Sequence, residues 1–171
     1  MQINFQEILP PDFDINSRVW IYQSSRVFEP AEIQVIKKKL ADFASSWKSH
    51  GAQVKGFGDL LFGQFILLMA DETATGVSGC STDSSVRMIK ELEKEFKVDL
   101  FDRQMLAFII NERVQLIPLS LINHSIESGL VTPNTLYFNN TILTRKELLT
   151  NWVIPVKKSW LEKRIQLVSG I

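Results

Sequence analysis

The sequence predicts an α+β fold, with a mostly antiparallel sheet and helices on one face, in a single domain of 171 residues. Apolar residues recur at three- and four-residue spacing near 30–47 and 85–96, which is typical of amphipathic helices. Short runs rich in β-branched and aromatic residues lie before, between and after these helices, and some are close enough to form hairpins. Strand, helix, two strands, helix and strand is the core order of ferredoxin-like folds. A doubly wound mixed sheet is the alternative, and it is disfavoured because hairpins outnumber crossovers.

The first elements are an arm, a strand and a helix. Residues 1–17 include Pro10 and Pro11 and are predicted to form an extended N-terminal arm. Residues 18–23 have the composition of a strand. Pro30 suits the first position of the following helix, and Gly51 is predicted to cap its end. The apolar stripe of this helix consists of Ile33, Ile36, Leu40, Phe43 and Trp47.

The middle of the chain is predicted to add two strands in 52–71, whose several glycines leave the hairpin register open. A second helix then begins near Ser85 and buries Val86, Ile89, Leu92 and Phe96. We expect one core to join the two helices to the strands. Its predicted members are Ile33, Ile36, Leu40, Phe43, Ile66, Leu68, Ile89 and Leu92.

The C-terminal part is predicted to contain a hairpin and two helices. Strands 105–110 and 114–118 flank Asn111 and Glu112, which suit a tight turn. A short helix over 120–128 ends at Gly129. Thr144 and Glu147 have capping-box spacing and begin a C-terminal helix over 144–168, with a kink at Pro155.

Composition narrows the class of protein. Nineteen basic residues balance nineteen acidic ones without a charge block, which predicts no nucleic-acid partner. The longest apolar run, 65–70, is far shorter than the roughly 20 residues needed to span a bilayer, so no membrane association is expected. The N-terminal residues lack the pattern of a signal peptide. A soluble cytoplasmic protein is the resulting expectation.

The candidate site is a hydroxyl-rich segment between the strand at 65–70 and the second helix. Glycine permits close approach of a ligand, hydroxyls donate and accept hydrogen bonds, and a helix N-terminus attracts anions. Asp83 opposes an anion, and hydroxyls also cluster at helix starts for structural reasons alone. The predicted site for a small anionic ligand comprises Ser78, Gly79, Cys80, Ser81, Thr82, Asp83, Ser84 and Arg87.

Two parts of the sequence resemble the motifs of ABC-type ATPases and of cysteine phosphatases, but neither motif is complete. Asp71 and Glu72 follow an apolar strand as in a Walker B motif, and 77–81 imitates the signature motif of ABC-type ATPases. Their order is reversed and the chain has no Gly-x-x-x-x-Gly-Lys-Ser/Thr loop, so we expect no such ATPase. A buried strand ending in solvated carboxylates is the preferred interpretation. Cysteine phosphatases have five residues between the nucleophilic cysteine and the arginine that binds the phosphate. Six residues separate Cys80 from Arg87, so this chain does not match that motif.

Metal and cofactor chemistry is not indicated. The chain has one cysteine and two histidines, which make no zinc set and no internal disulfide. We therefore predict neither a metal nor a cofactor.

Segments 78–86, 89–93 and 99–103 resemble a small, uncharacterised family of bacterial proteins. Members of that family often carry the label "ABC transporter ATPase". The resemblance implies no established activity and no catalytic residue, and the reversed motif order argues against the label.

Three functions are compatible with these patterns. The first is a non-catalytic module that binds a small anion or a protein partner. The second is a small enzyme using Cys80 or nearby acidic residues, which needs His50 or His124 within hydrogen-bond reach of the thiol. The third is a homodimer formed through an apolar surface at Phe57, Leu60, Leu61 and Phe62.

Overall fold

The computed structural model describes residues 4–169 and confirms the α+β class. The chain divides into two compact units where the sequence predicts one domain. The N-terminal unit comprises Asn4–Phe101 and Thr141–Leu149, and the C-terminal unit comprises Asp102–Asn140 and the described residues from Thr150 onward. Each unit has its own cluster of buried apolar side chains.

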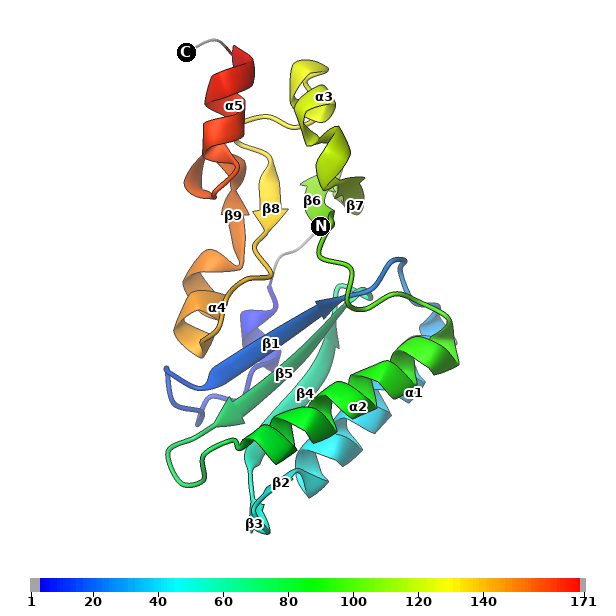
Figure 1. Cartoon of the computed structure of the whole chain (residues 1–171), viewed down its shortest axis with the longest axis vertical. Helices are drawn as coiled ribbons and strands as arrows, with labels where there is room; N and C mark the ends of the chain where they lie inside the picture. Colours follow the sequence, from blue (N-terminus) through cyan, green and yellow to red (C-terminus); the bar gives the residue numbers. More distant parts are fainter. Residues whose placement is uncertain (1–3, 170–171) are drawn as a thin grey trace. The chain divides into compact units, whose positions relative to one another are not determined.

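The N-terminal unit contains an antiparallel sheet covered on one face by two long helices (Figure 1). Of the three strands in this sheet, β5 comes last in the sequence but lies between β1 and β4, as in a split βαβ unit. The five elements are β1 (Arg18–Gln23), α1 (Pro30–Ser46), β4 (Lys55–Leu61), β5 (Phe65–Asp71) and α2 (Gly79–Phe96).

A fourth strand of ferredoxin-like type is replaced by a short contact on the outer edge of β1. The Val19 N–H donates to the Leu143 carbonyl at 2.9 Å, and the Arg145 N–H donates to the Ser17 carbonyl at 2.8 Å. The strand at 105–110, which follows α2 in the sequence, belongs to the C-terminal unit instead. The ferredoxin-like order therefore extends over the first five predicted elements only.

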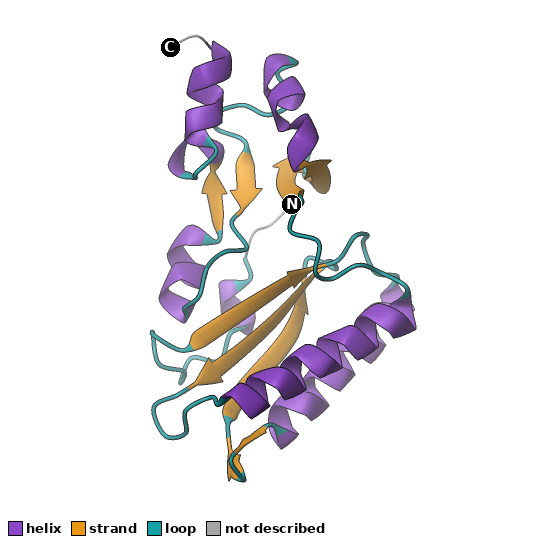
Figure 2. Cartoon of the chain, viewed as in Figure 1, coloured by secondary structure: helices purple, strands orange, loops and turns teal. Residues whose placement is uncertain are grey.

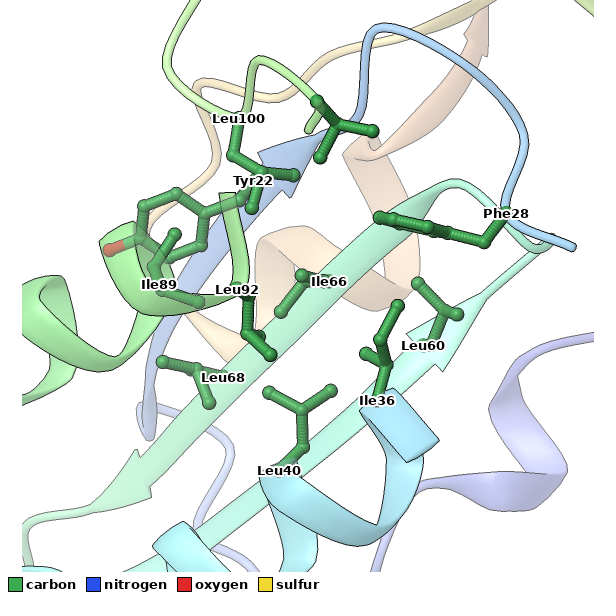
Figure 3. Close-up of a cluster of buried hydrophobic side chains, with 11 residues drawn as sticks. Tyr22, Phe28, Ile36, Leu40, Leu60, Ile66, Leu68, Ile89, Leu92 and Leu100 are labelled. Carbon is green, nitrogen blue, oxygen red and sulfur yellow. The ribbon is translucent and has the colours of Figure 1, made fainter. Parts of the chain in front are cut away.

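The predicted core is confirmed in the N-terminal unit (Figure 3). Side chains from α1 and α2 meet the even-numbered residues of the strands, because alternate residues of a strand face the same side. Ile33 and Phe43 lie partly buried at the margin of the cluster. Its fully packed members include Ile36, Leu40, Leu60, Ile66, Leu68, Ile89 and Leu92.

Two glycines let α1 lie close to β4. A Cβ atom on Gly58 would stand 3.2 Å from the Leu40 Cβ, and one on Gly56 would stand 3.0 Å from the Trp47 ring. Both glycines are thus required by helix packing rather than by a turn. The hairpin between β4 and β5 turns at Phe62 and Gly63, whose φ angles are 51° and 64°.

The start of α1 is held by Arg26 and Glu32. The Arg26 guanidinium donates to both Glu32 carboxylate oxygens, at 2.7 and 2.9 Å, and to the Phe96 carbonyl at 2.9 Å. The Glu29 N–H also donates to Glu32, at 2.8 Å. The two groups that donate to Glu32, first the Arg26 guanidinium and then the Glu29 N–H, lower the pKa of Glu32 to about 2.

The predicted cap of α1 at Gly51 is wrong. The helix ends at Ser46, and Gly51 has a φ of 84° in the turn between β2 (Lys48–Ser49) and β3 (Ala52–Gln53). This short hairpin is visible as a pair of orange strands in Figure 2. A glycine with positive φ serves a tight turn as well as a helix end, so its presence alone did not distinguish the two.

The N-terminal arm packs on the unit over residues 4–17, and residues 1–3 of the predicted arm lie outside the described residues. It contains a 3₁₀ turn (Gln6–Ile8), and its Phe5, Leu9 and Phe13 are buried. Phe5 packs edge-on against Phe62, with ring centroids 6.2 Å apart.

The apolar surface predicted at Phe57, Leu60, Leu61 and Phe62 is not exposed. Leu60 is 3% and Leu61 2% exposed, and Phe13 of the arm packs against Phe57 at 6.4 Å. Strand alternation directs Leu60 to the helix side of the sheet and Leu61 to the opposite side, and both sides are covered. A homodimer through this apolar surface therefore lacks its structural basis.

The C-terminal unit is built on a second antiparallel sheet of order β7-β6-β8-β9. The predicted hairpin turn at Asn111 and Glu112 is confirmed, with φ angles of 50° and 59°. The elements are β6 (Met105–Ile110), β7 (Arg113–Pro118), α3 (Ile122–Glu127), β8 (Leu136–Phe138), β9 (Val153–Pro155) and α5 (Glu162–Ser169).

The predicted C-terminal helix over 144–168 is wrong beyond its first turns. The capping box is present, since the Glu147 N–H donates to Thr144 Oγ1 and the Thr144 N–H to Glu147 Oε2, both at 3.2 Å. However, α4 (Arg145–Asn151) ends before Pro155, which lies in β9 instead of kinking a helix. Proline is accepted in β9 because it is an edge strand.

Among residues 4–169, no helix combines the length and the apolar character needed to cross a membrane.

Candidate functional site

The predicted site segment forms the first turns of α2 rather than a separate segment before the helix. Ser78 is the N-cap and Gly79 the first helical residue, six positions before the predicted start at Ser85. Serine, threonine and aspartate favour loops and helix starts alike, because their side chains bond to nearby backbone. Their density concealed the beginning of the helix.

The hydroxyls of this segment donate to the backbone of their own helix. Ser81 and Thr82 donate to the Ser78 carbonyl at 2.8 and 3.0 Å. Ser84 donates to the Ser81 carbonyl and Ser85 to the Thr82 carbonyl, each at 2.7 Å. A hydroxyl has one hydrogen to donate, so these four cannot donate to an anion while these bonds persist.

The inner side of the segment is engaged in packing. Ser81 and Ser85 are buried, and Trp47 Nε1 donates to the Ser81 carbonyl at 3.0 Å. The Ser81 N–H is capped by Ser78 Oγ at 3.3 Å, and the Ser78 N–H donates to Ser49 Oγ at 3.2 Å. These contacts join the start of α2 to α1 and to the β2–β3 hairpin.

The outer side of the segment carries Gly79, Cys80, Asp83 and Arg87, all exposed. Asp83 and Arg87, four residues apart, form no ion pair with any residue that the structure describes. The structure thus brings the eight predicted residues onto one helix end, but it separates inner hydroxyls from outer charges.

Cys80 is an exposed free thiol. His50 lies in the exposed turn between β2 and β3, and it forms no hydrogen bond to Cys80 within the described N-terminal unit. His124 belongs to α3 of the C-terminal unit. A hydrogen-bonded pair of Cys80 and His50 is therefore absent from the N-terminal unit.

Asp71, at the end of β5, is a buried carboxylate with a structural role. It is 3% exposed and accepts from Thr73 Oγ1 at 2.7 Å, from the Asp14 N–H at 3.2 Å and from Lys55 Nζ at 3.2 Å. The Thr73 hydrogen bond, with help from the other donors, holds the pKa of Asp71 well below its usual range. The sequence-based expectation of a solvated carboxylate is wrong here, because Asp71 fastens the arm to the sheet.

The outer edge of β4 is a feature that the sequence analysis missed. In an antiparallel sheet, alternate residues of a strand bond to the neighbour on one side. The Ser24 N–H donates to the Gln64 carbonyl at 2.8 Å, so the even-numbered residues of β5 bond to β1. The odd-numbered groups of β5 therefore bond to β4, and the even-numbered groups of β4 point outward. The Leu60 N–H agrees with this assignment, since it donates to Asp59 Oδ1 at 2.7 Å.

Two glycines remain open on this edge. The Leu60 N–H is covered by Asp59, and just before the strand the Val54 N–H donates to the Trp47 carbonyl at 2.9 Å. Between them, the outward N–H and C=O groups of Gly56 and Gly58 have no hydrogen-bond partner in the described part of the N-terminal unit. Glycines at alternate positions of a strand were the available sequence signal, but they were interpreted as turns.

Among the described residues, no group of three or more histidine, cysteine, aspartate or glutamate side chains is arranged to hold a metal ion. Comparison of the chain with protein-family models, with curated proteins and with solved structures finds no match.

Proposed function

We propose that this chain is a non-catalytic protein-interaction module that pairs the open edge of β4 with an extended segment of polypeptide. The observation that supports it is the pair of unpartnered backbone positions at Gly56 and Gly58. An edge strand with free N–H and C=O groups is a template for strand addition, in which main-chain hydrogen bonds provide the affinity.

Other functions have less support. Anion binding at the start of α2 now depends on exposed backbone at Gly79 and Cys80 and on Arg87, since the hydroxyls donate elsewhere. The enzyme alternative lacks a histidine hydrogen-bonded to Cys80 in its own unit. The proposal also keeps two expectations from the sequence, a cytoplasmic location and the absence of ABC-type ATPase activity.

The proposal predicts a polypeptide contact at β4. Phe57 replaced by the photoreactive analogue p-azidophenylalanine is expected to cross-link to a polypeptide on irradiation of living cells. Phe101, 36% exposed and packed against Tyr22 of β1, provides the matched control in the same unit. Adducts from position 57 but not 101 would support the module. No adduct from position 57, or equal adducts from both positions, would contradict it.

A second prediction separates the module from the enzyme. Cys80→Ser is expected to change the free energy of unfolding by less than about 0.5 kcal/mol, because the thiol is exposed. We expect the variant to complement a deletion strain as well as the natural chain does. A folded Cys80→Ser protein that fails to complement would favour the enzyme, especially if His50→Ala slows alkylation of the natural thiol.

A further inference from the structure

We infer that the segment accepted by the β4 edge is β4 of a second copy of this chain, so that the two sheets join in a symmetric antiparallel homodimer centred on Phe57. This inference rests on the proposed function and names its partner. It uses the backbone edge of β4, not the apolar surface that the arm and the helices cover.

The free hydrogen-bonding groups select one register. With the two-fold axis at Phe57, Gly56 stands opposite Gly58 of the second copy, and each such pair exchanges two N–H···O bonds. A register centred on Gly58 would instead require the Leu60 N–H, which donates to Asp59. A register centred on Gly56 would require the Val54 N–H, which donates to Trp47.

Charge favours the same register. Centred on Phe57, the pairing sets Lys55 opposite Asp59 of the second copy, twice across the axis. The side chain of Lys55 is 40% exposed, and its Nζ lies 3.0 Å from an Asp12 carboxylate oxygen and 3.2 Å from one of Asp71, so this register adds a further carboxylate to a lysine that is already paired. The Leu60 N–H and Lys37 Nζ, at 2.7 and 2.9 Å, both approach Asp59 Oδ1, which leaves Asp59 Oδ2 without a partner in the described unit.

Other registers of the two β4 strands would place side chains of like charge opposite each other. An axis at Lys55 would place two lysines face to face, and an axis at Asp59 would place two carboxylates face to face. The axis at Phe57 places two aromatic rings opposite each other on the side of the sheet that faces the arm. Hydrogen-bond availability, charge and side-chain type therefore favour one arrangement.

The register can be tested by disulfide formation in a Cys80→Ser background. Residues opposite each other at a non-hydrogen-bonded position have Cα atoms about 4.5 Å apart, within disulfide range. Phe57→Cys is therefore expected to form a disulfide-linked dimer under mild oxidation. Asp59→Cys is the matched control, since its two copies would lie roughly 13 Å apart along the paired strands. Equal cross-linking of both variants would overturn the register.

The association can be tested without a cysteine at position 57, in case Phe57→Cys disturbs the arm. Sedimentation of the natural chain over a concentration series is expected to show a reversible dimer. Asp59→Lys, which sets two lysines opposite each other, is expected to raise the dissociation constant several-fold while circular dichroism stays unchanged. A natural chain that remains monomeric throughout would overturn the homodimer.

The outcomes distinguish this inference from the proposed function. A monomeric chain that cross-links from position 57 to a different polypeptide would refute the homodimer and retain the module. A monomeric chain with no adduct from position 57 would refute both.

Discussion

Leu92→Ala is expected to lower the free energy of unfolding by about 2–5 kcal/mol, the usual loss when a buried leucine is truncated in a filled core. Leu92 is 2% exposed in α2 and belongs to the cluster that joins both helices to the sheet. Urea denaturation followed by circular dichroism would measure the loss as a lower midpoint with an unchanged slope.

Leu143→Ala provides the matched control for this experiment. It is the same substitution in the same unit, but Leu143 is 68% exposed. Its pairing with β1 uses the backbone carbonyl, which alanine retains. We expect a change below about 0.5 kcal/mol. If Leu92→Ala were as mild as Leu143→Ala, the assignment of Leu92 to the core would be wrong.

The sequence predicted those parts of the fold in which one local signal dominates. The stripe containing Ile36 and Leu40 indicates a helix and the uniformly apolar run at 65–70 indicates a buried strand, and both elements are found as predicted. The turn at Asn111 and Glu112 was equally clear, because asparagine tolerates positive φ and both polar residues interrupt two apolar strands.

Prediction failed where one pattern suits two structures. Leu148, Trp152 and Val156 follow each other at four-residue steps, which is helical spacing, yet only Leu148 lies in α4. Trp152 and Val156 are fully buried after the helix has ended. Pro155 was therefore the stronger signal, since it cannot donate the hydrogen bond that a continuing helix would need.

The candidate site was predicted less well than the fold, for a physical reason. The hydroxyls of 78–85 suggested a ligand because one cap appeared sufficient, but Ser84 and Ser85 bond back to the preceding turn of the helix. The open edge at Gly56 and Gly58 depends on which strand is outermost, and strand order is a long-range property that local sequence does not encode.

Asp71→Asn is expected to destabilise the protein by about 1–3 kcal/mol at neutral pH, the usual cost of leaving buried partners of a charged group poorly satisfied. The carboxylate joins three parts of the N-terminal unit, through Thr73, Lys55 and the Asp14 N–H. Asparagine keeps the shape but loses the charge and one acceptor oxygen. Faster hydrogen exchange at the Asp14 amide would show that the arm has loosened.

The loss should depend on pH in a defined direction. Because the pKa of Asp71 is lowered in the folded protein, its contribution is fully present above the unfolded value of about 3.9 and disappears as pH falls toward the folded value. The difference in unfolding free energy between the natural chain and Asp71→Asn should therefore be constant from pH 7 to 5 and shrink below about pH 4.

Asp83→Asn supplies the control for the pH series, because Asp83 is exposed and forms no ion pair among the described residues. Its difference from the natural chain should stay small throughout. A difference for Asp71→Asn that persists unchanged to pH 2 would mean that the variant fails for reasons of packing. If instead the difference vanishes with acid while Asp14 exchange rises in the natural chain, then the charge of Asp71 holds the arm against the sheet. That charge would then add to the buried Phe5, Leu9 and Phe13 side chains and to the Arg145 hydrogen bond to the Phe13 carbonyl, which also hold the arm.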